Sequence, residues 1–133
     1  MAGNKFGARK VRDPITGEMF DSQKEYNQWR VLKLMEKAGD ISNLQRQVKF
    51  ELIPSQRKAS TEVYKAGHQK GLPKPGEIIE KPCNYVADFT YIDDKGKLNV
   101  IDVKGCKQGA AYDLFVIKRK LMLLVHGIRV REI

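Results

Sequence analysis

Apolar residues recur along this chain at two spacings, one typical of helices and one typical of strands. Residues 22–38 carry an apolar stripe at helical spacing; Ser22 can cap this helix and Gly39 can stop it. Residues 112–126 repeat the amphipathic pattern and end at Gly127. We therefore predict a helix in each of these two segments.

Strict alternation of apolar and polar residues marks further segments as strands. Two of them are rich in β-branched and aromatic residues, and the turn sequence "DDKGK" between them predicts a hairpin. Arg46 interrupts the apolar face of the first segment, which favours a later start for that strand. The predicted strands cover residues 44–53, 84–93, 98–104 and 128–133.

The order of these segments indicates the fold class. A small hairpin with its turn in residues 13–17 precedes the first helix. Three strands, the second helix and a last strand follow, an order typical of an α/β fold with a mixed sheet. At 133 residues we expect one domain over residues 13–133, preceded by a basic flexible arm at residues 1–12.

Residues 54–82 follow neither spacing. They contain four prolines, three glycines, and six Lys or Arg against three Glu. We predict a long, mobile, basic loop inserted into the domain, with a short ordered piece near "IIE" at residues 78–80. Because loops of this length are usually functional or disordered, a linker and a DNA-contacting segment are both open interpretations.

Composition excludes several classes of protein. No run of about 18 apolar residues is present, and the first residues lack the apolar core of a signal peptide. We therefore expect a soluble, cytoplasmic protein without a membrane partner. Two cysteines without C-x-x-C spacing provide neither a disulfide framework nor a zinc motif.

A net charge of +9 favours a polyanionic partner, usually nucleic acid. Charge alone does not separate a DNA enzyme from an RNA-binding module. The basic arm could contact a phosphate backbone or be a solvated tail, and the basic residues of the second helix could face a cleft or water. The candidate DNA contacts are Lys5, Arg9, Lys10, Arg57, Lys58, Lys65, Lys70 and Lys118.

Two acids and a lysine lie inside strands that otherwise read as buried. Strand alternation places Asp102 and Lys104 on one face, and the predicted hairpin brings Asp88 level with Asp102. Two carboxylates at such a short distance repel each other unless a cation lies between them. Mg²⁺ is a cation that binds carboxylate and phosphate oxygens. Lys104 could then steady an attacking hydroxide or the charge on phosphorus. A buried Asp–Lys ion pair without chemistry is the alternative, but it gives no reason for Asp88.

The first helix offers a third acid. Glu25 shares its stripe with Trp29 and Leu32, so its carboxylate is expected to point toward the sheet. The alternative is a capping box, because Ser22 and Glu25 have the S-x-x-E spacing.

Together these residues resemble the PD-(D/E)XK nuclease superfamily, whose pattern is an acid in one strand and acid-x-Lys in the next. Asp88 matches the first acid, Asp102 and Lys104 match the second motif, and Glu25 matches a helical glutamate of several branches. The sequence is most similar to small phage-encoded nucleases related to Holliday junction resolvases. The resemblance covers residues 18–133 apart from the loop at 54–82.

Two residues depart from the pattern of this superfamily. Ala87 stands in place of the proline in its name, a frequent change. Asp102 stands in place of the commoner glutamate, which shortens the reach to a metal and leaves the preferred ion open.

The resemblance implies a restriction-endonuclease-like core of order α-β-β-β-α-β and a Mg²⁺-dependent endodeoxyribonuclease, with Mn²⁺ able to substitute. It implies that Asp88, Asp102, the Val103 carbonyl and Glu25 hold the metal, and that Lys104 orients the attacking water. It also implies branched DNA as substrate, in phage recombination or replication, and a homodimer in the host cytoplasm. The alternative function is a non-catalytic, basic nucleic-acid-binding protein whose acids are structural.

Overall fold

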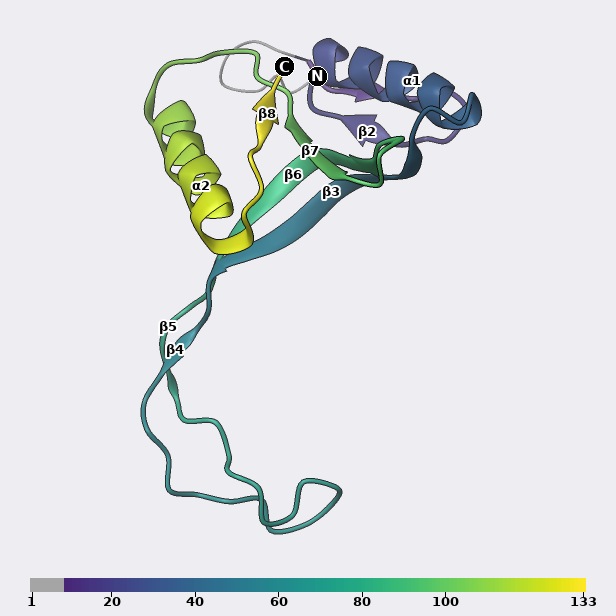
Figure 1. Cartoon of the computed structure of the whole chain (residues 1–133). Coiled ribbons are helices and arrows are strands. Elements are labelled where there is room, and N and C mark those ends of the chain that lie inside the picture. Colours follow the sequence, from purple (N-terminus) through teal and green to yellow (C-terminus); the bar gives the residue numbers. More distant parts are fainter. Residues whose placement is uncertain (1–8) are drawn as a thin grey trace. The chain divides into compact units, whose positions relative to one another are not determined.

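The computed structural model describes residues 9–133 and divides them into two compact units. One unit comprises the described residues up to Phe50 together with Val86–Ile133, and the other is Glu51–Tyr85. The elements, labelled in Figure 1, are β1 (Val11–Arg12), β2 (Met19–Phe20), α1 (Gln23–Lys37), β3 (Ser42–Ile53), β4 (Gln56–Arg57), β5 (Ile78–Glu80), β6 (Cys83–Ile92), β7 (Leu98–Asp102), α2 (Ala110–His126) and β8 (Arg131–Glu132).

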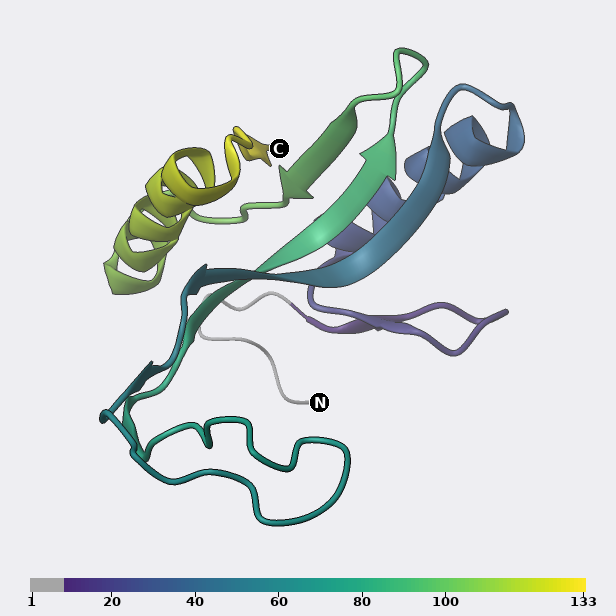
Figure 2. The same ribbon diagram turned by 60° about the horizontal axis from the view of Figure 1, so that its bottom comes forward.

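A four-stranded sheet in the order β3-β6-β7-β8 forms the centre of the fold. β6 and β7 are the predicted hairpin and pair antiparallel, with Thr90 opposite Val100. β8 pairs with β7 in parallel, which sets Asp102 opposite Glu132. In Figure 2, β6 and β7 run between α2 on one side and α1 on the other. The predicted α/β core with a mixed sheet is confirmed.

α1 is held by a local cap and by aromatic packing. The Glu25 N–H donates to the Ser22 hydroxyl at 3.1 Å, which starts the helix where the sequence predicts. Its buried face sets Trp29 against Phe89 of β6, with ring centroids 5.8 Å apart. Phe20 of the β1–β2 hairpin packs on the same helix, so the hairpin, α1 and one face of the sheet share a core.

α2 begins at Ala110, two residues before the predicted start, and ends as predicted before Gly127. Gly127 has a φ of 67°, the left-handed cap conformation that glycine adopts at low cost. The helix buries Phe115 and Met122. The strand predicted over residues 128–133 is reduced to the two residues of β8.

β3 differs from the prediction at its start. It begins at Ser42 rather than Leu44 and contains Arg46, so the expectation of a late start was wrong. The charged side chain is tolerated because its guanidinium carbon lies 3.8 Å from the ring centroid of Phe20 and contacts Glu25. In β7, the paired strand ends at Asp102 rather than Lys104.

The unit Glu51–Tyr85, which includes the predicted basic loop, contains short paired strands. β4 and β5 pair antiparallel, and Val63 forms a further bridge with Pro73. The ordered piece expected at residues 78–80 is β5. Within residues 9–133, no helix is long and apolar enough to span a membrane.

Candidate active site

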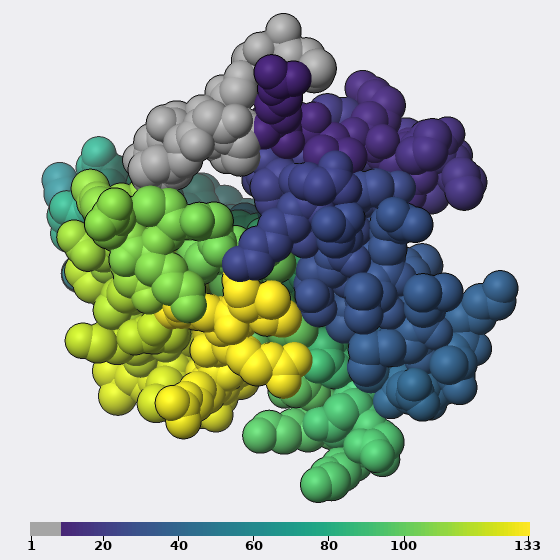
Figure 3. All heavy atoms as spheres, turned by 90° about the horizontal axis from the view of Figure 1, so that it is seen from above, coloured from purple at the N-terminus to yellow at the C-terminus, as the bar shows by residue number. Residues whose placement is uncertain are grey.

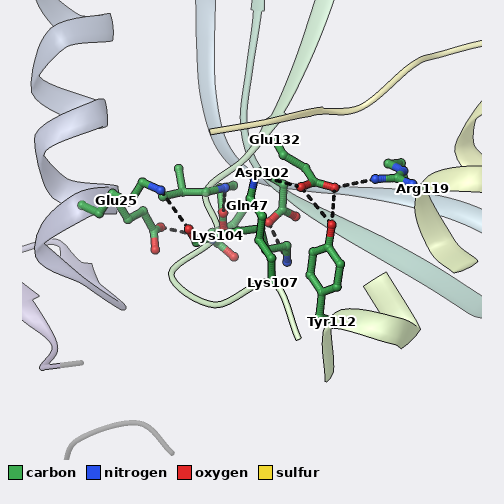
Figure 4. Close-up of polar contacts among 11 residues, drawn as sticks. Glu25, Gln47, Asp102, Lys104, Lys107, Tyr112, Arg119 and Glu132 are labelled. Atoms are coloured by element: carbon green, nitrogen blue, oxygen red, sulfur yellow. Dashed lines mark hydrogen bonds and ion pairs between the residues drawn. The ribbon is translucent and has the colours of Figure 1, made fainter. Parts of the chain in front are cut away.

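Three acids and a lysine meet where the end of β7 lies near β6 and the first turn of α1. Asp88 comes from β6, Asp102 is the last residue of β7, and Lys104 follows two residues later. Glu25 comes from the first turn of α1. Figure 4 shows Glu25, Asp102 and Lys104 in one region, with Gln47 of β3 beside them.

The carboxyl group of Asp88 is under the influence of both other acids. Burial and the charge of Asp102 are the largest causes that raise its pKa, to about 7, and the charge of Glu25 adds to them. The hydrogen bond from Val103 and the charge of Lys104 oppose this shift. Because such interactions act over short distances, the three acids form one cluster, although the sequence spreads them over 78 residues from Glu25 to Asp102.

Asp102 and Lys104 form a close pair. Asp102 is 5% exposed, and its Oδ1 lies 2.8 Å from the Lys104 Nζ. The same ammonium group lies 3.8 Å from the ring centroid of Phe115 on α2. Lys104 therefore offsets the charge of Asp102 and is itself positioned between β7 and α2.

The backbone N–H of Val103 is turned toward β6. The Asp102 carbonyl and the Lys104 N–H both bond to Ile133, each at 2.9 Å, and so point toward β8. In an extended strand, the groups of the intervening residue point the opposite way. The Val103 N–H accordingly donates to Asp88 Oδ2 at 2.8 Å.

Glu25 serves as a cap and as a member of the acid cluster. It is 4% exposed, and its Oε2 accepts the Asp21 N–H at 3.3 Å, a variant of the expected capping box. Its Oε1 lies 3.7 Å from Arg46 Nη2 and 3.5 Å from Gln47 Nε2. Burial and the charge of Asp21 raise the pKa of Glu25, and Arg46 opposes that rise. The two interpretations of Glu25 are therefore compatible.

Arg46 and Gln47 are site residues that the sequence analysis did not identify. Arg46 interrupts the apolar face of its strand, and this was a signal for the contact with Glu25. A guanidinium that faces the core requires an acidic partner nearby. Gln47 has a φ of 52°, a left-handed conformation that is unusual for a non-glycine residue in a strand and costs free energy. No pattern in the sequence predicts that conformation.

A fourth acid lies across the β7–β8 pair from Asp102. Glu132 accepts hydrogen bonds from the Tyr112 hydroxyl at 3.1 Å and from Arg119, and Lys107 Nζ is 3.6 Å away. Burial disfavours its charge, but the bonds from Tyr112 and Arg119 outweigh burial and lower the pKa of Glu132. Figure 4 shows this network beside Asp102. No local pattern in the sequence predicts Glu132 as a neighbour of the site, because only the parallel pairing of β7 and β8 brings it here.

The donor set matches a hard divalent cation. Carboxylate oxygens and a backbone carbonyl are ligands that Mg²⁺ prefers, and a cation would relieve the repulsion among the acids. Within residues 9–133, however, no three acidic, histidine or cysteine side chains stand close enough together to ligate a metal as they are. Lys104 contacts one oxygen of Asp102, so a metal ligated by that oxygen would displace this lysine.

The predicted DNA-contacting residues are spread over the chain. Lys5 lies outside the described residues, and Arg9 and Lys10 are exposed. Lys118 is half-buried on α2, one turn beyond the buried Phe115, rather than on a solvated face. The four predicted contacts in the unit Glu51–Tyr85 are all exposed, and they are Arg57, Lys58, Lys65 and Lys70.

Two of the exposed basic residues in Glu51–Tyr85 also stabilise that unit. The Arg57 guanidinium donates to the Gly76 carbonyl at 2.8 Å. Lys58 Nζ lies 3.5 Å from a carboxylate oxygen of Glu77, an exposed and therefore weak ion pair. Neither contact occupies all the donors of its side chain, so both residues can still contact a phosphate.

Comparison with known proteins gives one family. A family model described as "Protein of unknown function (DUF1064)" matches residues 3–126. No curated protein and no solved structure matches the chain.

Proposed function

Because the chain belongs to the DUF1064 family, whose function is unknown, we propose its activity from the site: a metal-dependent endodeoxyribonuclease that hydrolyses phosphodiester bonds. The observation that carries this proposal is the cluster of Glu25, Asp88 and Asp102, in which burial and the neighbouring carboxylates raise the pKa of Asp88 to about 7. Such repulsion is costly in a purely structural cluster and useful in a cation site.

The chain supplies specific groups for this chemistry. Asp88, Asp102, the Val103 carbonyl and Glu25 would hold Mg²⁺, with Mn²⁺ able to substitute. A bound divalent cation lowers the pKa of water and stabilises negative charge on a phosphoryl oxygen. Lys104, once released from Asp102, would orient the attacking water or donate to the phosphoryl group.

In this reaction the oxygen of water bonds to phosphorus and one ester P–O bond breaks. The water loses a proton and the leaving oxygen gains one. Lys104 Nζ lies 2.8 Å from Asp102 Oδ1, so it would face the charge that develops on phosphorus beside this carboxylate.

The finer parts of the proposal rest on the resemblance to PD-(D/E)XK nucleases. The order α1-β3-β6-β7-α2-β8 agrees with their α-β-β-β-α-β core. We extend the proposal to branched DNA, such as Holliday junctions or flaps, and to a phage enzyme that works in the cytoplasm of its bacterial host.

A homodimer belongs to the same proposal, since cutting two strands symmetrically requires two sites. Leu114, Ile117 and Leu124 of α2 are 53%, 56% and 80% exposed and follow helical spacing, so this stripe is a suitable surface for a second copy. Pairing of the same stripe on both copies is the arrangement that a two-fold axis produces.

Cleavage assays test the proposal. Purified protein would be incubated with junction, flap, linear and single-stranded DNA in Mg²⁺, Mn²⁺ or chelator. We expect cutting that depends on the metal, and a decrease of at least about a hundredfold in Asp102→Asn and Lys104→Ala, with DNA binding retained. Lys95→Ala, which changes an exposed lysine in the β6–β7 turn, is the matched control.

The second candidate is a non-catalytic nucleic-acid-binding protein. The direct contact between Asp102 and Lys104 favours it, because a buried pair of this kind can be purely structural. DNA binding without cutting on any substrate would favour this candidate, whereas full activity in Asp102→Asn would reject the assigned catalytic site.

A further inference from the structure

A large cleft lies between α2 and the strands β7 and β8. Its volume is about 1060 Å³, far more than a small anion needs. Side chains of α2 form one wall, and residues 97–100 and 127–132 contribute the other. Figure 3 shows the C-terminal segment, in yellow, at the molecular surface beside α2.

Positive charge dominates this cleft. Of its 14 lining residues, five are Lys or Arg and one, Glu132, is acidic. That carboxylate accepts hydrogen bonds from Tyr112 and Arg119 and lies 3.6 Å from Lys107 Nζ, so three groups already share its charge. The five cationic residues are Lys97, Arg119, Lys120, Arg129 and Arg131.

Two of these cations also have structural partners. Arg119 bonds to Glu132, and Arg131 donates to the Tyr91 hydroxyl at 2.8 Å. Lys97, Lys120 and Arg129 are exposed. The cleft therefore combines two guanidinium groups fixed by their partners with three basic side chains that water can reach.

The cleft begins beside the candidate active site. Glu132, at one end, is the Cα partner of Asp102 in the β7–β8 pair. Lys97, at the other end, precedes β7, and five residues of extended chain span roughly 16 Å. Each DNA strand carries a phosphate every ~3.4 Å along the duplex axis, so a cleft of this length can contact several successive phosphates.

We propose that this cleft binds the phosphate backbone of the DNA duplex flanking the bond that is cut. The inference rests on the proposed nuclease function and adds the surface that holds the substrate in place. Lysine and arginine contacts to phosphates give affinity without reading the base sequence. The cleft thereby accounts for basic side chains that the carboxylate cluster does not use.

A pair of matched triple variants tests this inference. The cleft triple is Lys97→Ala, Lys120→Ala and Arg129→Ala, and the control triple is Lys33→Ala, Lys37→Ala and Lys95→Ala. All six residues are exposed and both triples remove three positive charges, so general electrostatic attraction falls equally. Binding to a labelled duplex would be measured by anisotropy in chelator, between about 50 and 200 mM salt.

We expect the cleft triple to weaken binding at least about tenfold and to reduce the salt slope by roughly 2 to 3, with a much smaller effect of the control triple. Equal decreases in both triples, or no decrease in the cleft triple, would overturn the inference. Circular dichroism shows whether the cleft triple folds. If it does not, two single variants on helix surfaces replace the triples: Lys120→Ala for the cleft and Lys37→Ala as its control.

The same experiment separates the two proposals. Because binding is measured in chelator, the result does not depend on cleavage. A selective decrease in the cleft triple supports the binding surface even if the wild-type protein never cuts DNA, an outcome that would overturn only the nuclease function. Metal-dependent cutting with equal affinity of the two triples would retain the nuclease function and reject the cleft.

Discussion

The proton affinity of Asp88 depends on its burial and on carboxylates from two other segments. In the folded chain its pKa is raised from 3.8 to about 7, so between these values the folded state holds a proton that the unfolded state has released. This group therefore stabilises the fold less and less as pH rises through that window. The effect should be visible only without a divalent cation, which would itself offset the repulsion.

We predict that the melting temperature of the metal-free protein falls between about pH 5 and pH 8, and that it falls distinctly less in Asp88→Asn. Asparagine can still accept the Val103 N–H but cannot ionise. At pH 8 the variant should match or exceed the wild type, by on the order of 1 kcal/mol. Thermal melts with chelator at the two pH values provide the measurement.

Millimolar Mn²⁺ supplies the control for that experiment. It should raise the melting temperature of the wild type and not of Asp88→Asn, because only the intact cluster binds the ion. A variant destabilised by roughly 3 kcal/mol, with no metal effect on the wild type, is what a structural ion-pair cluster predicts.

Arg46 is the cation that allows Glu25 to be buried. Its guanidinium contacts that carboxylate at 3.7 Å and packs on Phe20, with a side chain only 15% exposed. We predict that Arg46→Met destabilises the protein by about 3 kcal/mol in urea unfolding, because it leaves a buried acid without a counter-charge. Glu18→Gln removes its more exposed partner and should cost under about 1 kcal/mol. Equal effects of the two variants would contradict this role.

Among the elements, α2 contributes to several different surfaces. Phe115 packs against Lys104 near the candidate active site, and Arg119 and Lys120 line the basic cleft. The stripe that includes Ile117 and Leu124 is exposed. One helix thus connects the site, the cleft and the proposed dimer surface.

We predict that Ile117→Glu combined with Leu124→Glu converts a dimer of the wild-type protein into a monomer, because like charges would face each other across a two-fold axis. Light scattering of both proteins gives their masses. Val31→Glu with Leu34→Glu is the matched control on α1, where both residues are also exposed. A monomeric wild type would reject the homodimer.

At the scale of the whole molecule, the charge of +9 is not confined to one unit. The unit Glu51–Tyr85 has its own strand pairing and exposes basic side chains. We predict that neutralising four of them weakens DNA binding and lowers the salt slope by roughly 0.9 for each phosphate that the variant no longer neutralises. The four are Arg57, Lys58, Lys65 and Lys70.

A salt titration of that fourfold variant beside the wild type checks this prediction. An unchanged slope would mean that the unit does not contact DNA. Arg57 and Lys58 also bond within the unit, so a thermal melt of the variant must first show that the chain still folds.

The sequence by itself determined what depends on near neighbours. Ser22 and Glu25 are three residues apart, so the start of α1 follows from a local cap. Strand alternation and a tight turn place Asp88 and Asp102 on adjacent strands, because both rules act over a few residues. The α/β class and the three acids of the candidate site could therefore be predicted.

Only the tertiary structure decided which distant charges meet. Arg46 and Glu25 approach when β3 packs beside α1, and Glu132 comes opposite Asp102 when β8 pairs with β7. The left-handed backbone at Gln47 likewise has no local signal. The physical reason is that Coulomb interactions and parallel pairing depend on distance in space, and a one-dimensional pattern contains no information on that distance until the sheet is assembled.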